Sequence, residues 1–258
     1  MKSLATQTWW MTARRLRVFV QQPGYLLIML VQPVIWLFLF GNLFRRVVEL
    51  PGFGSASYVD YLVPGVVVMS AISSNMWAGM GAMEEIERGT LDRFLVTPVS
   101  RGALMNASVV EQAVGTTIQS VIIVLLGWAA GAHYPGGVAG VAVLVVASVL
   151  LGTVFGAMSN AIGMLVRQRE TIIGINTFLL LPLTFLSSAF MATALMPGWM
   201  QAIARGNPVN WALDAARGAL STQRDWVDVA VSGGALAALA AAMVWLSTRT
   251  FRAYQKAV

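Results

Sequence analysis

The chain has 258 residues, of which 57% are hydrophobic and only 11% are charged, and its formal net charge is +6. Soluble domains carry about 25% charged residues, so this composition excludes an ordinary soluble protein and indicates an integral membrane protein. Cysteine is absent and His133 is the one histidine, which excludes a disulfide framework, a thiolate metal site, a cysteine nucleophile and a histidine cluster.

The N-terminal segment, residues 1–22, is predicted to be an amphipathic helix that lies in the membrane surface. One face carries apolar residues at helical spacing, namely Trp9, Ala13, Leu16 and Val20. Basic and amide side chains take another face, and two adjacent tryptophans suit the headgroup level of a bilayer. Pro23-Gly24 is expected to end this helix.

Six apolar stretches follow, and each is expected to cross the membrane as a helix. Their expected ranges are 25–44, 61–82, 106–131, 138–166, 171–192 and 229–247. A hydrocarbon core about 30 Å thick requires about 20 apolar residues in a helix, and all six stretches are close to or above that length. Pro33 is expected to kink the first span. The whole chain, 1–258, is therefore predicted to be one all-α transmembrane domain.

The distribution of basic residues predicts the orientation. Most of the 17 lysines and arginines fall in segments that are cytoplasmic when both termini are cytoplasmic. We therefore expect a multi-pass protein of a bacterial inner (plasma) membrane with both termini inside. This orientation puts residues 84–105 in the cytoplasm and residues 193–228 outside.

The cytoplasmic segment 84–105 is the longest charged interruption between two apolar stretches. Thr90 can cap a short helix there, Asp92 suits the first turn of the helix dipole, and Pro98 ends it. The apolar residues that share one side are Leu91, Phe94 and Leu95. A short helix of this kind between two spans is typical of a docking element for a cytoplasmic partner. The alternative is a solvated connector with three incidental apolar residues.

The outer segment 193–228 is predicted to contain two short helices that dip into the outer leaflet. Leu195–Arg205 and Trp211–Leu220 are mostly apolar, but each is far too short to span the membrane. The fourth span has small residues four positions apart, which favours close helix packing. These residues are Ser148, Gly152, Gly156 and Asn160.

The chain shows no pattern typical of an enzyme. Its only lysines are Lys2 and Lys256, so a Walker A phosphate loop is impossible. Glu111 is the one acid that a span could bury, and no inverted repeat is evident, which argues against an ion-coupled transporter. If the protein moves a molecule, the energy must come from a partner, and the docking helix is where it would enter. A membrane scaffold or sensor that recruits a partner without transport is an alternative.

Two motifs carry a family resemblance. The run Glu87–Leu95, ERGTLDRFL, followed by TPVSR, closely resembles the first cytoplasmic loop of ABC-2 type permeases, especially the membrane subunits of daunorubicin-resistance exporters. Asn207-Pro208 with Trp211, Asp214 and Arg217 is similar to the motif in their last external loop. The likeness covers essentially the whole chain. It implies the ABC-2, or type V exporter, fold: six spans, an N-terminal interfacial helix and short re-entrant external helices before the last span.

The resemblance also implies a function. The chain would be the permease subunit of an ABC exporter that moves amphipathic small molecules, drugs or lipids, out of the cell. It would pair with two copies of a nucleotide-binding subunit and with a second permease, the same or a related chain. ATP and Mg²⁺ would bind to the partner ATPase, and this chain would hold no cofactor or metal. A lipid or polysaccharide-precursor exporter of the same fold is the alternative within the class.

The resemblance assigns roles to three groups of residues. The ATPase-docking residues would be Glu84, Glu87, Arg88, Thr90, Leu91, Asp92, Arg93, Phe94 and Leu95. The external gate would be formed by Asn207, Pro208, Trp211, Asp214 and Arg217. The substrate path between the two permeases would be lined by Gln32, Trp36, Phe40, Asn75, Met76, Asn176, Phe178 and Phe185. Aromatic residues in a membrane helix can instead face lipid or neighbouring helices.

Overall fold

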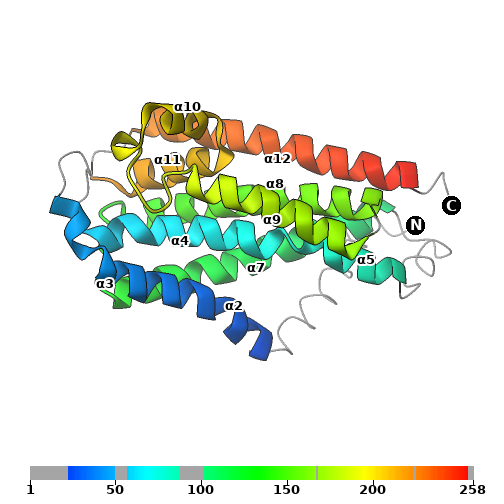
Figure 1. Cartoon of the computed structure of the whole chain (residues 1–258), viewed down its shortest axis with the longest axis horizontal. Coiled ribbons are helices and arrows are strands. Elements are labelled where there is room, and N and C mark those ends of the chain that lie inside the picture. The colour runs from blue at the N-terminus through cyan, green and yellow to red at the C-terminus, as the bar shows by residue number, and fades with distance from the viewer. Residues whose placement is uncertain (1–22, 50–56, 88–100, 167, 223–224, 255–258) are drawn as a thin grey trace.

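The computed structural model describes residues 23–49, 57–87, 101–166, 168–222 and 225–254. Every secondary-structure element in these ranges is a helix, in agreement with the predicted all-α class (Figure 1). The predicted surface helix, residues 1–22, and the predicted docking helix, residues 90–96, lie outside the described residues.

The elements follow one another from the N-terminal side as a broken first helix, a long bundle and a pair of short helices before the last long helix. The first group is α2 (Pro23–Ile35), the π-helical turn η1 (Trp36–Phe40), α3 (Gly41–Leu43) and the 3₁₀ turn η2 (Arg45–Glu49). The others are α4 (Tyr58–Asn75), α5 (Ala78–Glu87), α7 (Arg101–Ala129), α8 (Gly137–Val166), α9 (Arg169–Phe185), η3 (Thr193–Leu195), α10 (Gly198–Gly206), α11 (Pro208–Leu220) and α12 (Trp226–Tyr254).

Four helical segments of the described chain are long and apolar enough to cross a membrane. They are Tyr58–Gly81, Ser108–Ala129, Gly137–Val166 and Trp226–Thr250. The first and fifth expected spans are shorter: the apolar helix of the first covers Leu30–Leu43, and α9 ends at Phe185 instead of reaching Ala192. The count of six spans therefore stays a prediction.

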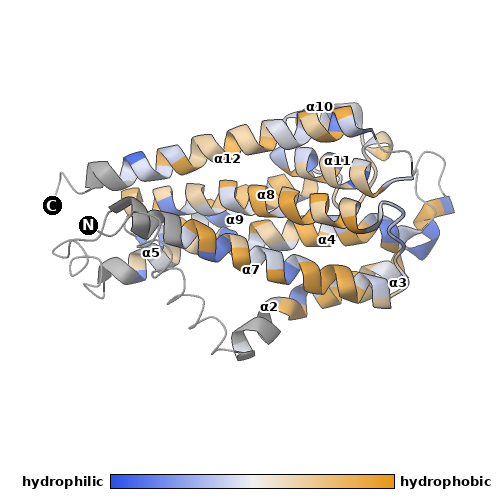
Figure 2. Cartoon of the chain, turned by 180° about the vertical axis from the view of Figure 1, so that it is seen from behind, coloured by the Kyte–Doolittle hydropathy of each residue, from blue (hydrophilic) through white to orange (hydrophobic). Residues whose placement is uncertain are grey.

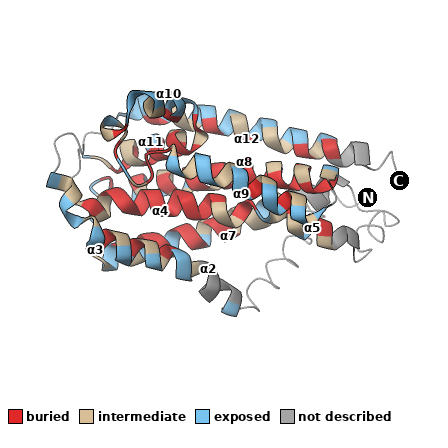
Figure 3. Cartoon of the chain, in the orientation of Figure 1, coloured by how far each residue is buried: buried red, intermediate tan, exposed pale blue. Residues whose placement is uncertain are grey.

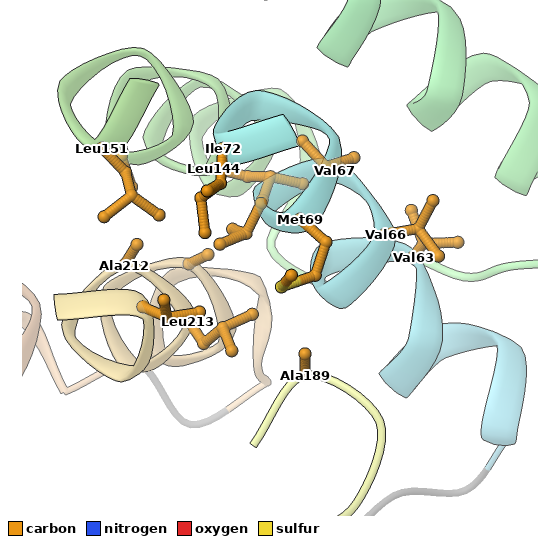
Figure 4. Packing of buried hydrophobic residues seen from close by; sticks show 14 of the residues in the cluster. Val63, Val66, Val67, Met69, Ile72, Leu144, Leu151, Ala189, Ala212 and Leu213 are labelled. Atoms are coloured by element: carbon orange, nitrogen blue, oxygen red, sulfur yellow. The ribbon is translucent and has the colours of Figure 1, made fainter. Parts of the chain in front are cut away.

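The helix α4 forms the centre of the bundle, with α8 beside it. Its residues from Tyr61 to Ile72 are buried on all sides, which is why α4 is almost uniformly red in Figure 3. Figure 4 shows Met69 and Ile72 of α4 packed close to Leu144 of α8 and Leu213 of α11. Helices in a membrane associate through such close packing, because lipid tails are as apolar as leucine side chains.

The helix α12 lies at the edge of the bundle. Only 11% of the most apolar stretch within Trp226–Thr250 is buried, against 72% of the corresponding stretch within Tyr58–Gly81. The surface of α12 is mostly apolar in Figure 2, and the same holds for the outer side of α7, where Val121, Leu125 and Trp128 are exposed. Exposed apolar side chains on such helices are expected where lipid tails cover the protein.

The two ends of the bundle carry different short helices. Figure 1 shows α10 and α11 at one end, where α11 packs against α8 and α12, and α5 at the opposite end. The helix α8 runs between them and packs against α4, α5, α7, α11 and α12.

Candidate functional site

Asn207 joins the start of α11 to the end of α9. Its side chain accepts a hydrogen bond of 3.0 Å from the Val209 amide, which caps α11, and Pro208 occupies the first turn. The Asn207 Nδ2 atom also donates to the carbonyls of Leu183 and Leu186, each at 3.0 Å. The last carbonyls of a helix have no partner within it, and here a residue far along the chain satisfies two of them.

Asn210 makes a second connection between the same two regions. Its Oδ1 atom accepts hydrogen bonds from the Ser188 amide at 2.7 Å and from the Ser188 hydroxyl at 2.9 Å. Its Nδ2 atom donates to the Ala204 carbonyl at 2.6 Å. The side chain is only 4% exposed, so all three bonds lie in a buried setting. Sequence reasoning missed Asn210, although an asparagine three positions after Asn207 on an otherwise apolar helix face was a usable signal.

Arg217 extends the connection to α4. Its guanidinium donates to the Ser188 hydroxyl at 3.1 Å, to the Tyr61 carbonyl at 3.2 Å and to the Ala189 carbonyl at 3.4 Å. It also lies over the Tyr61 ring, 3.7 Å from the centroid, in a cation–π contact. The Tyr61 hydroxyl in turn donates to the Ser188 carbonyl at 2.6 Å. One forked cation thus joins three chain segments.

For Arg217 and for Asp214, burial and the charge of the other residue shift the pKa in opposite directions. Burial lowers the pKa of its guanidinium, while the nearby Tyr61 and Asp214 oppose that shift. Desolvation raises the pKa of the Asp214 carboxyl, and the charge of Arg217 opposes it. The Asp214 side chain nevertheless lies on the exposed side of α11. On the same helix, the indole nitrogen of Trp211 donates a hydrogen bond to the Arg205 carbonyl at 2.9 Å.

The residues predicted as an external gate therefore separate into two sets. Asn207 and Arg217 face inward and, with Asn210, hold the segment after α9 against α11 and α4; we call these three residues the α9–α11 clamp. Trp211 and Asp214 lie outside the clamp, and Trp211 contacts the end of α10. The clamp consists mainly of side-chain bonds to backbone groups, which can be exchanged for water if the region opens.

At the opposite end, α5 is the described part of the predicted docking region. Glu84 lies on α5 and is half-buried, and Glu87 is its last residue. Arg88, Thr90, Leu91, Asp92, Arg93, Phe94 and Leu95 lie outside the described residues. The next described helix, α7, begins at Arg101, so the last part of the expected loop is helical.

Two of the predicted path residues, Asn75 and Met76, lie at a break between α4 and α5. The Met80 amide bonds to the Trp77 carbonyl, so the Met76 carbonyl loses its usual helical partner. It accepts instead from the Ser159 hydroxyl of α8 and from Asn176 Nδ2 of α9, the latter at 2.6 Å. We call this position the Met76 break. At this break, the Met76 carbonyl connects the α4–α5 junction to α8 and α9 in the bundle interior.

Asn75 and Asn176 are buried rather than exposed in the single chain. Asn75 Nδ2 donates to the Ala71 carbonyl at 2.7 Å and to the Thr116 hydroxyl of α7 at 2.8 Å. Asn176 is only 1% exposed, and its Oδ1 atom has no hydrogen-bond partner among the residues that the structure describes. Both amides thus hold neighbouring helices together.

Trp36 and Phe40 form an aromatic stack at the π-helical turn. Their ring centroids are 4.4 Å apart, and the Trp36 ring stacks on Phe190 at 4.8 Å. The stack continues from Phe40 to Phe44 at 5.4 Å. The first helix is therefore fixed to the same segment after α9 that the clamp holds. A π-helical turn inside a helix is frequent at functional positions.

The remaining path residues lie on the surface of the chain. Gln32 is exposed on α2, and Phe178 and Phe185 of α9 are 75% and 63% exposed. Large aromatic side chains exposed to this degree must be covered by lipid or by another chain. The role of all eight residues in a substrate path stays a prediction.

Comparison with known proteins places the chain in a family. The profile of the ABC-2 type transporter family matches residues 6–221, which is most of the chain. The daunorubicin resistance ABC transporter permease protein DrrB1 of Streptomyces coeruleorubidus is 27% identical over 93% of this chain and 83% of its own length. The putative transport permease ycf38 of Cyanophora paradoxa is 28% identical over 78% of this chain and 70% of its own. The inner membrane transport permease YadH of Escherichia coli K12 is 26% identical over 79% and 77%.

Proposed function

The chain belongs to the ABC-2 type transporter family, as a membrane permease subunit of an ABC transporter, and from this premise we propose that it exports amphipathic small molecules, drugs or lipids. The observation that carries the proposal is the match along most of the chain to permeases, one of which is named for daunorubicin resistance. Phe178 and Phe185 are exposed on α9, and a path that they line against a second permease would be apolar and would suit amphipathic molecules.

The family implies an ABC ATPase subunit as partner. We propose that two copies of this ATPase bind ATP and Mg²⁺ and dock on the helix at Thr90–Val96 of each permease. A second permease, the same or a related chain, completes the transporter. The complex is proposed to lie in the bacterial inner membrane with both permease termini in the cytoplasm.

The proposed cycle uses both ends of the bundle. ATP binding closes the two ATPase subunits and draws the docking segments inward, which rocks the permeases about their interface. The α9–α11 clamp then loosens, and the path opens past α10 and α11. ATP can drive this change only if it binds one state more tightly than the other, and closure of the ATPase pair supplies that difference.

Transport by the purified complex tests the proposal. The permease and its copurifying ATPase would be reconstituted in liposomes, and the ATP-dependent movement of daunorubicin and of a fluorescent phospholipid would be followed. We expect ATP to drive at least one of the two probes. An assembled, ATP-hydrolysing complex that moves neither would overturn export of amphipathic molecules and would favour a scaffold or a polysaccharide-precursor exporter.

Aspartates on the apolar side of the predicted docking helix test whether that helix binds the ATPase. The double variant Leu91→Asp/Phe94→Asp is expected to lose copurification of the ATPase and ATP-dependent transport, because a buried unpaired carboxylate is costly. Val99→Asp places one such charge after Pro98, beyond the predicted helix, and serves as the control for each of the two single substitutions. Intact assembly and transport in the double variant would remove the docking proposal.

A further inference from the structure

The backbones of α5 and α8 are in direct contact. A Cβ atom added at Gly79 would lie 2.2 Å from the Ser159 carbonyl oxygen, and one added at Gly163 would lie 2.7 Å from the Gly79 carbonyl oxygen. Both distances are far below an ordinary van der Waals contact. Because the two backbones approach each other this closely, a displacement of one helix at this crossing must move the other.

The Ser159 hydroxyl completes this contact. It accepts a hydrogen bond of 3.1 Å from the Gly79 amide and donates to the Met76 carbonyl. These are the amide and carbonyl that the Met76 break deprives of helical partners. A single hydroxyl on α8 therefore replaces part of the helical bonding between α4 and α5, and α5 takes its position from α8.

The opposite end of α8 repeats the arrangement against α11. A Cβ atom added at Gly140 would lie 2.6 Å from the Ala219 carbonyl oxygen, and one added at Gly136 would lie 2.3 Å from the same oxygen. The Gly136 amide also donates to the Leu220 carbonyl at 2.9 Å. Here too the contact is between backbones.

We propose that α8 is a rigid strut that transmits the movement of α5 to α11, with Gly79, Ser159, Gly163 and Gly140 as positioning residues. The strut has 30 residues, hence a length of about 45 Å, and spans the bundle from one contact to the other. The helix α5 ends directly before the predicted docking segment, and α11 carries the clamp. The inference rests on the proposed function, because α8 has a movement to transmit only if the ATPase displaces the docking segment.

Spin labels test the rigidity directly, and the lack of native cysteines makes the labelling specific. One pair joins Gly81→Cys on α5 to Leu165→Cys on α8, where Gly81 faces open space and Leu165 is 69% exposed. The other joins Val138→Cys on α8 to Thr222→Cys after α11, both at exposed positions. In the complex with its ATPase, both distance distributions should be the same without nucleotide and after trapping with ATP and vanadate. A shift in either pair overturns the strut.

A second measurement tests the transmission. Ile203→Cys on exposed α10 reports on the α11 end through its rate of reaction with a membrane-impermeant maleimide. We expect that rate to change on ATP trapping in the parent chain, and the change to be lost in Gly163→Ala and in Gly140→Ala. Gly81→Ala and Gly174→Ala are the matched controls, because a Cβ atom at either position meets no neighbour.

The outcomes separate this inference from the proposed function. A reporter that never responds to ATP, or that still responds in both glycine variants, overturns transmission through α8. Transport of daunorubicin or phospholipid by the same complex would leave the export function intact. If a glycine variant fails to assemble, the spin-label pairs decide, since they leave the glycine contacts at 79, 140 and 163 unchanged.

Discussion

The contact of α11 with the segment after α9 and the contact of α5 with α8 are made by different means. At the α11 end, the clamp residues Asn207, Asn210 and Arg217 reach backbone groups of the segment after α9. At the α5 end, the backbones of Gly79 and Gly163 belong to two helices so close that a Cβ atom at either glycine would meet a backbone carbonyl oxygen of the opposite helix. Side-chain hydrogen bonds can be exchanged for bonds to water at a net cost of about 1 kcal/mol each, or about 1.5–3 kcal/mol where one partner is charged, whereas close-packed backbones leave no room for water. The side-chain bonds of the clamp suit a region that opens, and the backbone contact suits two helices that move together.

The largest effect is expected from removing the centre of the clamp. Arg217→Leu leaves the Tyr61 and Ala189 carbonyls without their donor, and bonds to charged groups are worth about 1.5–3 kcal/mol each. We expect the free energy of unfolding to fall by about 3 kcal/mol or more, measured by thermal unfolding of the purified complex. Arg217→Lys should recover only part of it, since an ammonium cannot fork. The exposed Arg205→Leu is the control; an equal loss there would mean that Arg217 has no special role.

A smaller loss is expected at Asn210. Asn210→Leu keeps the side-chain size but leaves the Ser188 amide and the Ala204 carbonyl unpaired and buried, at a cost of about 1–3 kcal/mol. Asn42→Leu is the matched control, because Asn42 is exposed and its amide donates to the nearby Phe38 carbonyl, four residues earlier in the chain. If both variants unfold at the same temperature, the clamp does not depend on Asn210.

At the α5 end, Ser159 and Asn176 both donate to the Met76 carbonyl, so their contributions to the free energy of unfolding can be compared directly. Ser159→Ala removes one bond to Met76 and one from Gly79, and should destabilise the complex by about 1–2 kcal/mol. Asn176→Leu removes one bond to Met76 but also an unpaired buried oxygen, so its net effect should be smaller. The two unfolding free energies, measured side by side, decide the order. The reverse order would show that α9 rather than α8 holds the break.

The smallest effect is expected in the aromatic stack. A double-mutant cycle on Trp36 and Phe190, with leucine at each position, should give a coupling energy of about 0.5–1.5 kcal/mol, as stacked aromatic pairs do. The exposed Leu39, on the same turn, is the control partner for Phe190. A coupling no larger than that of the control would mean that the first helix is not fixed to the segment after α9 by stacking.

Apolar stretches and turn residues were sufficient to predict much of the architecture. The fourth expected span, 138–166, nearly coincides with α8, and the two short helices before the last span are present as α10 and α11. The small residues expected to pack closely include Gly152, where a Cβ atom would lie 2.7 Å from Asn75 Nδ2. These features depend on local composition and spacing, which a single sequence contains.

The Met76 break was not predictable in the same way. Neither proline nor glycine occurs at 76–77, and the groups that satisfy the Met76 carbonyl come from Ser159 and Asn176, 83 and 100 positions later. The early end of α9 has a similar cause, because Asn207 satisfies the carbonyls of Leu183 and Leu186 from another element. Such partners are set by tertiary structure, so helical periodicity does not indicate them.

The contact between Gly79 and Gly163 restricts how the chain can change over evolution. Even an alanine at either position forces a carbonyl oxygen of the opposite helix to move, so one substitution alone would separate α5 from α8. A lineage can therefore keep both glycines or replace them only together with a repositioned helix pair. Relatives such as DrrB1 differ from this chain at nearly three of every four aligned positions, yet we expect these two sites to vary jointly, while 81 and 174 drift independently.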